Sequence, residues 1–152
     1  YITYENLNDE FSTDIFTENV LRGKLGVNAI ESAKSLYDFI VLDSMVTEKN
    51  FAESLEHQDD VVVYTKLPRG FYINTPMGKY NPDWAVAFRE GSVKHVYFVA
   101  ETKGTDDLPS DIRGAENSKI ECARKHFAAI SEKDVIFDVA KDYQTLYNIV
   151  TK

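Results

Sequence analysis

Two apolar runs joined by a short polar segment constrain this chain more than any other feature. They are DWAVAFRE (83–90) and HVYFVAETK (95–103), and Gly91-Ser92 lies between them. Strand-forming residues on both sides of a Gly-containing turn predict an antiparallel hairpin. A two-residue turn pairs residues whose numbers sum to 183 and sets Asp83 opposite residue 100. A four-residue loop gives 185 and sets Asp83 opposite residue 102. Either register brings Asp83 within one position of Glu101.

Three polar side chains gather at the open end of this hairpin. Glu101 and Lys103 are two residues apart and therefore share a face of their strand. Two opposed carboxylates repel each other unless a cation lies between them, and Mg²⁺ prefers such oxygen ligands. Lys103 would then assist a water or stabilise charge on phosphate. The plainer alternative is a weak ion pair at solvated strand ends. Pro82, which fixes the backbone before Asp83, and the central-strand pattern of 96–100 favour a site.

The remaining pattern predicts an α/β (mixed α+β) domain in which helices cover both faces of a mixed sheet. Residues 1–35 are expected to be a helical or irregular lead-in and residues 36–152 the folded domain. Ser44 is expected to cap the first helix of that domain and Asp142 the last. Strands are expected at 37–44, 60–67, 71–74, 83–90, 95–103 and 134–140, and helices at 45–57, 115–130 and 142–150.

Length and charge narrow the function. The 152 residues suit one domain, and the absence of an initiator Met suggests a piece of a larger protein. A net charge of −8 argues against a free-standing nucleic-acid binder. An acidic charge remains compatible with a nuclease domain that uses carboxylates to bind metal ions while other parts of a larger protein bind the DNA. With no apolar run long enough to span a bilayer, no signal peptide and Cys122 as the single cysteine, we expect a cytoplasmic protein without a membrane partner.

Pro82-Asp83, followed 18 residues later (101 − 83) by Glu101-Thr102-Lys103, resembles the PD-(D/E)xK nuclease motif. Four longer sequence segments make the resemblance more specific: YDFIVLDSMVTEKNFAESLE, YTKLPRGFYINTPMGKYNPDWAV, VYFVAETKG and ENSKIECARKHF. Together they resemble the C-terminal endonuclease domain of the restriction (Res) subunit of type III restriction–modification enzymes. The resemblance covers about residues 37–140.

The resemblance implies a restriction-endonuclease-like fold and Mg²⁺-dependent hydrolysis of double-stranded DNA. Asp83 and Glu101 would bind the metal with the Thr102 carbonyl, and Lys103 would be the catalytic lysine. It also implies partners: the helicase-like remainder of the Res chain, whose motor uses ATP, and the Mod methyltransferase subunit. This chain has no GxxxxGK[ST] phosphate loop and so is not the motor. Two alternatives stay open, namely a non-catalytic docking domain of nuclease fold and a different PD-(D/E)xK nuclease of repair or junction-resolving type.

Four further residues are candidates for accessory roles. Glu48 matches an acidic position that in such nucleases can lie near the metal, although it could equally be a helix-surface glutamate paired with a neighbouring lysine. Glu116 and Lys119 could lie beside the site or form a weak i, i+3 pair. Lys66 could approach phosphate, but a solvated lysine at a strand end is the plainer expectation.

Overall fold

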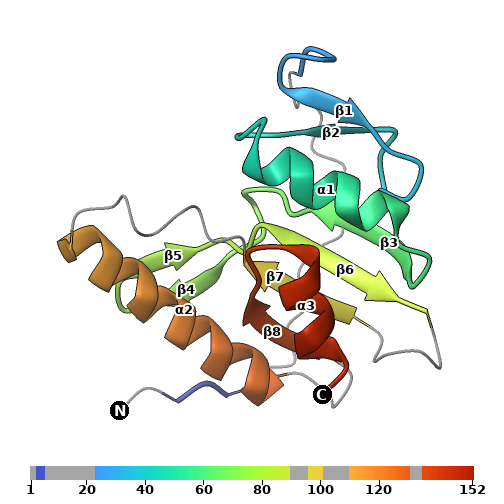
Figure 1. Cartoon of the computed structure of the whole chain (residues 1–152). Helices are drawn as coiled ribbons and strands as arrows, with labels where there is room; N and C mark the ends of the chain where they lie inside the picture. The colour runs from blue at the N-terminus through green and yellow to red at the C-terminus, as the bar shows by residue number, and fades with distance from the viewer. Residues whose placement is uncertain (1–2, 6–22, 90–95, 101–109, 131–134) are drawn as a thin grey trace.

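The computed structural model describes residues 3–5, 23–89, 96–100, 110–130 and 135–152 (Figure 1). Side chains of 96–100, 110–112 and 130 are not among the described features. Three helices and eight strands occur in these ranges. The strands are β1 Ala29–Glu31, β2 Phe39–Val41, β3 Val61–Lys66, β4 Ile73–Thr75, β5 Gly78–Tyr80, β6 Trp84–Phe88, β7 Val96–Ala100 and β8 Val135–Val139, and the helices are α1 Thr47–His57, α2 Ser110–Ile130 and α3 Tyr143–Val150.

A mixed four-stranded sheet in the order β3-β6-β7-β8 forms the centre of the domain. The β3–β6 and β6–β7 pairs are antiparallel, whereas β7 and β8 run parallel. The parallel pair needs a crossover, which α2 provides between the two strands. The predicted mixed sheet is confirmed, and the two strands of the predicted hairpin occupy its middle.

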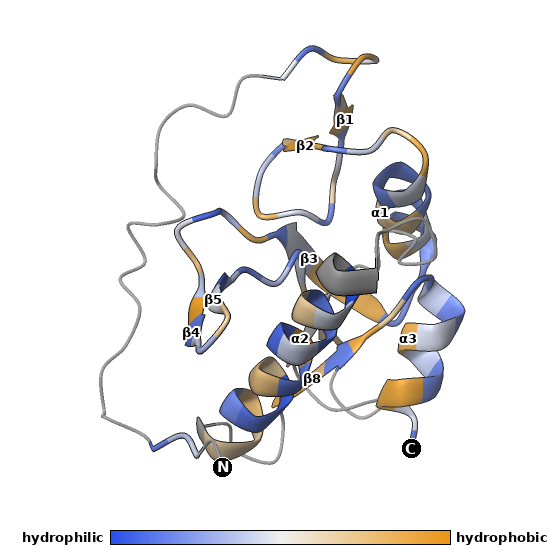
Figure 2. Ribbon diagram, turned by 90° about the vertical axis from the view of Figure 1, so that its left-hand side faces the viewer, coloured by the Kyte–Doolittle hydropathy of each residue, from blue (hydrophilic) through white to orange (hydrophobic). Residues whose placement is uncertain are grey.

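Helices cover both faces of this sheet, as the sequence predicted. Trp84, Val86 and Phe88 alternate along β6 and point into one core, which they share with buried residues of α1 and α3. On the opposite face, α2 contributes Ala123 and Phe127 to a second cluster. That cluster also contains Ile73, Tyr80 and Phe137, so the β4–β5 hairpin packs on the α2 side. Figure 2 shows α2 and α3 on either side of β8.

The small antiparallel ribbon of β1 and β2 packs beside β3. Ser35 forms a bridge with Tyr64, whose backbone N–H donates to the carbonyl of Lys34 at 3.1 Å, so the 32–35 loop lies along the outer edge of β3. Gly23 lies against the ribbon so closely that an added Cβ would be 2.8 Å from Val41 Cγ2 and 2.9 Å from Ala29 Cβ. Only glycine fits this approach without a shift of its neighbours.

Several predicted boundaries are confirmed and others need correction. Asp142 caps α3, since its Oδ1 accepts the Thr145 N–H at 2.8 Å. Ser44 is not the N-cap of α1; Val46 holds that position, although the Ser44 hydroxyl accepts the Thr47 N–H at 3.2 Å. The strands β1 and β5 were not predicted, and α2 begins at Ser110 instead of residue 115. The predicted helical part of the lead-in and the turn at 91–92 lie outside the described residues. Within the described ranges, none of the helices is long and apolar enough to cross a membrane.

Candidate active site

The register of the central strands decides between the two predicted hairpin alignments. Trp84 pairs with Val99, Ala85 with Phe98 and Ala87 with Val96, so paired numbers sum to 183. Continuing that register by one residue sets Asp83 opposite Ala100, the last residue of β7. The alignment that sums to 185 is therefore wrong. Glu101, Thr102 and Lys103 follow Ala100 directly in the chain but lie outside the described residues.

The backbone around Asp83 is held firmly in place. The Leu67 N–H donates to the Asp83 carbonyl at 2.7 Å, which ties this position to the end of β3. The side-chain amide of Asn81 donates to the carbonyls of Phe71 at 2.5 Å and Pro68 at 3.2 Å. Pro82, between these two anchors, is fully buried. The Asn-Pro-Asp segment is thus fixed by hydrogen bonds and packing before β6 begins.

Asp83 and Glu116 lie on the α2 side of the sheet, around the phenol of Tyr80. Burial raises the pKa of Tyr80 above its ordinary value, and the carboxylates of Asp83 and Glu116 raise it further. Glu116 also lies 3.9 Å from Lys119, one helical turn away, and its side chain is 41% exposed. The i, i+3 pair predicted as the plainer alternative is therefore present. An ion pair this exposed contributes little to stability.

Glu48 is completely buried and is not the helix-surface residue allowed for by the sequence. Its Oε2 accepts the Asp43 N–H at 2.6 Å, the Ser44 N–H at 3.3 Å and the Lys66 ammonium at 2.9 Å. Its other oxygen, Oε1, has no hydrogen-bond partner in the described part of the chain. The lysine that pairs with it comes from β3 and not from its own helix. A buried carboxylate of this kind needs compensation, because an unpaired buried charge is costly.

Lys66 is ion-paired and mostly buried, which corrects the expectation of a solvated lysine. Its Nζ lies 2.8 Å from Asp43 Oδ2 and 2.9 Å from Glu48 Oε2, and 18% of its side chain is exposed. Burial lowers the pKa of Lys66, but hydrogen bonds and charge from the two carboxylates outweigh burial, so the pKa is raised. Sequence reasoning missed Asp43, whose only signal was an acidic residue directly after an apolar run.

Asp83 and the Lys66 ion-pair group lie at the same end of the sheet. Lys66, the last residue of β3, pairs with Trp84, the first residue of β6, and Asp83 immediately precedes that residue. Trp84 packs against Phe51 of α1, so the Lys66 group lies on the α1 face. Within the described residues, no three Asp, Glu, His or Cys side chains form a group that could hold a metal ion. The predicted Mg²⁺ ligand set stays a prediction, since two of its members lie outside those residues.

Comparison with known families adds the deciding observation. Residues 33–144 match the family model described as "Endonuclease domain", a span that contains Asp83, Glu48, Lys66 and the whole central sheet. The chain belongs to this family of endonuclease domains. Its α/β architecture is accordingly restriction-endonuclease-like, as the sequence predicted. No match was found among curated proteins or among solved structures.

Proposed function

We propose that this chain is the DNA-cutting module of a type III restriction enzyme, and that it hydrolyses phosphodiester bonds of double-stranded DNA with Mg²⁺. The observation that carries the proposal is the register of β6 and β7. It sets Asp83 opposite Ala100, directly before the Glu101-Thr102-Lys103 triplet. Membership in an endonuclease family supports the nuclease chemistry. The type III assignment rests on the sequence resemblance.

In this proposal Asp83, Glu101 and the backbone carbonyl of Thr102 hold Mg²⁺. These donors fit the ion, because Mg²⁺ prefers carboxylate and carbonyl oxygens and completes its shell with water and substrate phosphate. The ion would polarise the phosphate and its bound water. Lys103 orients the attacking water or stabilises the charge that develops on phosphate. The anchored backbone of Asp83 supports this role, since a metal ligand has to be held in position.

The surroundings of the four accessory candidates support different roles for them. Glu48 is buried and one of its oxygens lacks a hydrogen-bond partner among the described residues, but it lies on the α1 face of the sheet, whereas Asp83 lies on the α2 side. We therefore assign Glu48 to the ion pair with Lys66 and not to the metal. Glu116 shares the α2 side of the sheet with Asp83 and is the accessory carboxylate we favour, with Lys119 at 3.9 Å as its partner. Lys66 is engaged by Asp43 and Glu48, so we assign it to positioning Glu48 and not to phosphate contact.

In the proposed restriction enzyme, other parts of the assembly would supply the motor and the recognition of the DNA site. A helicase-like remainder of the Res chain would consume ATP, and a Mod methyltransferase subunit would recognise the DNA site. The net charge of −8 supports this division of labour, since the other parts would provide the basic DNA-binding surface. Such an assembly would act in the cytoplasm.

The test compares Mg²⁺-dependent cleavage of a DNA duplex by the parent assembly with Asp83→Asn or Lys103→Ala in this domain. Asp59→Asn and Lys141→Ala make the same charge changes at positions outside the candidate site and serve as matched controls. We expect the first two variants to lose cleavage while ATP hydrolysis continues, and both controls to cut normally. Unchanged cleavage by Asp83→Asn and Lys103→Ala would contradict the site assignment and favour a non-catalytic docking domain.

A further inference from the structure

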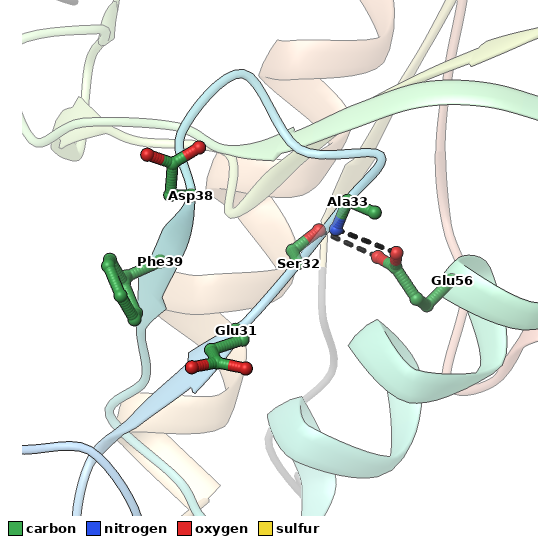
Figure 3. A pocket seen from close by; sticks show the side chains of 6 residues that line it. All are labelled: Glu31, Ser32, Ala33, Asp38, Phe39 and Glu56. Carbon is green, nitrogen blue, oxygen red and sulfur yellow. Dashed lines mark hydrogen bonds between the residues drawn. The ribbon is translucent and has the colours of Figure 1, made fainter.

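A shallow hollow of about 420 Å³ lies between the β1–β2 ribbon and the C-terminal end of α1 (Figure 3). The hollow is remote from the candidate active site. Glu48 and Glu56 are eight residues apart on α1, which corresponds to about 12 Å along the helix axis. The hollow is lined by Glu31, Ser32, Ala33, Asp38, Phe39 and Glu56.

Glu56 forms one wall of the hollow, and its hydrogen bonds are satisfied within the protein. Its Oε2 accepts from the hydroxyls of Ser32 at 2.6 Å and Tyr64 at 2.9 Å. Its Oε1 accepts from the N–H groups of Ala33 at 2.8 Å and Lys34 at 3.2 Å. These donors are neutral, and the Lys34 ammonium donates instead to the Gln58 carbonyl at 2.6 Å. The negative charge of Glu56 therefore adds to the potential in the hollow.

The other two acidic residues of the hollow, Glu31 and Asp38, are open to solvent and to a ligand. Glu31 and Asp38 are exposed, and neither carboxylate forms a hydrogen bond or ion pair within the described ranges. Phe39 lies directly opposite Glu31 in the ribbon, and 52% of its surface is exposed. Opposed residues of an antiparallel pair have Cβ atoms about 4.5–5.5 Å apart, so the aromatic ring and the carboxylate are neighbours.

The chemistry of the hollow selects one kind of ligand. Three carboxylates would repel the phosphates of DNA. The described residues contain no group of three acidic, His or Cys side chains able to hold a metal ion, so a compact cation fits poorly. A guanidinium fits well, because it is planar, bonds carboxylates through a fork of N–H groups and stacks on aromatic rings. Leu36 and Tyr37, which precede Asp38, are exposed by 58% and 38% and add apolar surface.

We propose that this hollow is a docking site for a segment of a partner protein that presents an arginine next to an apolar residue. The arginine enters between Glu31, Asp38 and Phe39, and the apolar neighbour covers Leu36 and Tyr37. Arginine and aromatic residues are enriched where protein interfaces carry their binding energy. The inference does not depend on the proposed nuclease chemistry, since it concerns the opposite end of α1.

The test follows backbone amide signals of the 152-residue chain by NMR during titration with the peptide acetyl-Ala-Arg-Leu-Arg-Ala-amide. We expect shifts at residues 31–33 and 38–39 that weaken with added salt. The same peptide with citrulline in place of arginine keeps the shape but loses the charge, and we expect no shifts at those residues. Equal shifts with both peptides, shifts spread over the acidic surface or none at millimolar peptide would overturn the proposal.

Two variants and one matched control complete the test. The double change Glu31→Gln/Asp38→Asn and the single change Phe39→Leu alter only exposed side chains and should each weaken binding, the double change by about tenfold or more. Glu53→Gln/Asp59→Asn removes two exposed charges outside the hollow and should leave the affinity unchanged. Equal weakening by this control, shifts at the hollow with a DNA duplex, or shifts that follow dilution of the chain itself would each refute an arginine-bearing partner.

Discussion

Removing the ammonium of Lys66 should destabilise the domain far more than removing its exposed partner. Lys66→Met keeps most of the aliphatic stem and its packing but deletes the charge that compensates Glu48. The Glu48 side chain is 1% exposed, and breaking a buried ion pair by removing one partner costs about 3–5 kcal/mol. Asp43, the second partner, has a side chain that is 55% exposed. Asp43→Asn should therefore cost only about 0–1 kcal/mol.

Urea unfolding of the wild type and the variants measures these differences, with equal m-values as the condition for comparing them. The double variant Glu48→Gln/Lys66→Met removes both charges while the glutamine oxygen can still accept from the backbone. It should be at least about 1 kcal/mol more stable than Lys66→Met alone. Lys49→Met, at an exposed pair 3.6 Å from Glu53, is the matched control and should change stability little. A loss below about 1 kcal/mol in Lys66→Met would refute the reasoning.

The pH dependence gives an independent check on the same pair. Because the pKa of Lys66 is raised above 10.5 in the folded protein, its contribution is complete below pH 10.5 and is lost as pH rises through the folded value. The stability difference between wild type and Lys66→Met should therefore shrink in alkaline solution. A difference that stays constant from pH 8 to pH 12 would contradict the assigned ion pairs.

Three smaller changes test other parts of the fold. Gly23→Ala places a Cβ within 2.9 Å of the ribbon and should cost about 1–3 kcal/mol, seen as a lower Tm. Gly114→Ala, on an open face of α2, should instead stabilise by about 0.5–1 kcal/mol, and a loss would reveal an unexpected close contact. Asp142→Ala removes the α3 cap and should cost about 1 kcal/mol. Hydrogen bonds from the Thr145 hydroxyl and backbone N–H lower the pKa of Asp142. The part of this cost that depends on the Asp142 charge is therefore fully present above pH 3.8 and is lost as pH falls through the lower folded value.

The central sheet could be predicted from the sequence because alternation and turn residues, which mark its strands, are local patterns. Strict alternation in β6 and the short distance across the turn were enough to give two candidate registers, one of which is observed. The same alternation puts Trp84, Val86 and Phe88 on one face of β6, and all three are buried. The three-residue strands β1 and β5 are too short for a periodic pattern and were missed. Their formation depends on partners that a local pattern cannot identify.

The surroundings of the site were harder to predict, because they are made by tertiary contacts. Glu48, Phe51 and Leu55 are spaced i, i+3 and i+7 along α1 and share one face of the helix, yet a glutamate is normally exposed. Its burial depends on Lys66, which is 18 residues away in the chain, and on backbone donors of the preceding turn. Nothing in the local sequence marks that combination. The register places Asp83 correctly, whereas the predicted roles of Glu101, Thr102 and Lys103 stay predictions.

The loop along the outer edge of β3 bears on how this domain could be shortened. A chain that starts at residue 36, the boundary predicted from sequence, would lose the Lys34 carbonyl that accepts from Tyr64 and the Ser32 and Ala33 donors to Glu56. The unpaired N–H and C=O groups of β3 would then be open to a strand from another molecule. The run VVVYTK combines strong strand formers with low charge, as aggregating segments do. Residues 32–35, just before the predicted boundary, thus cover this edge of β3, and light scattering should show more self-association of the shortened chain than of the full one.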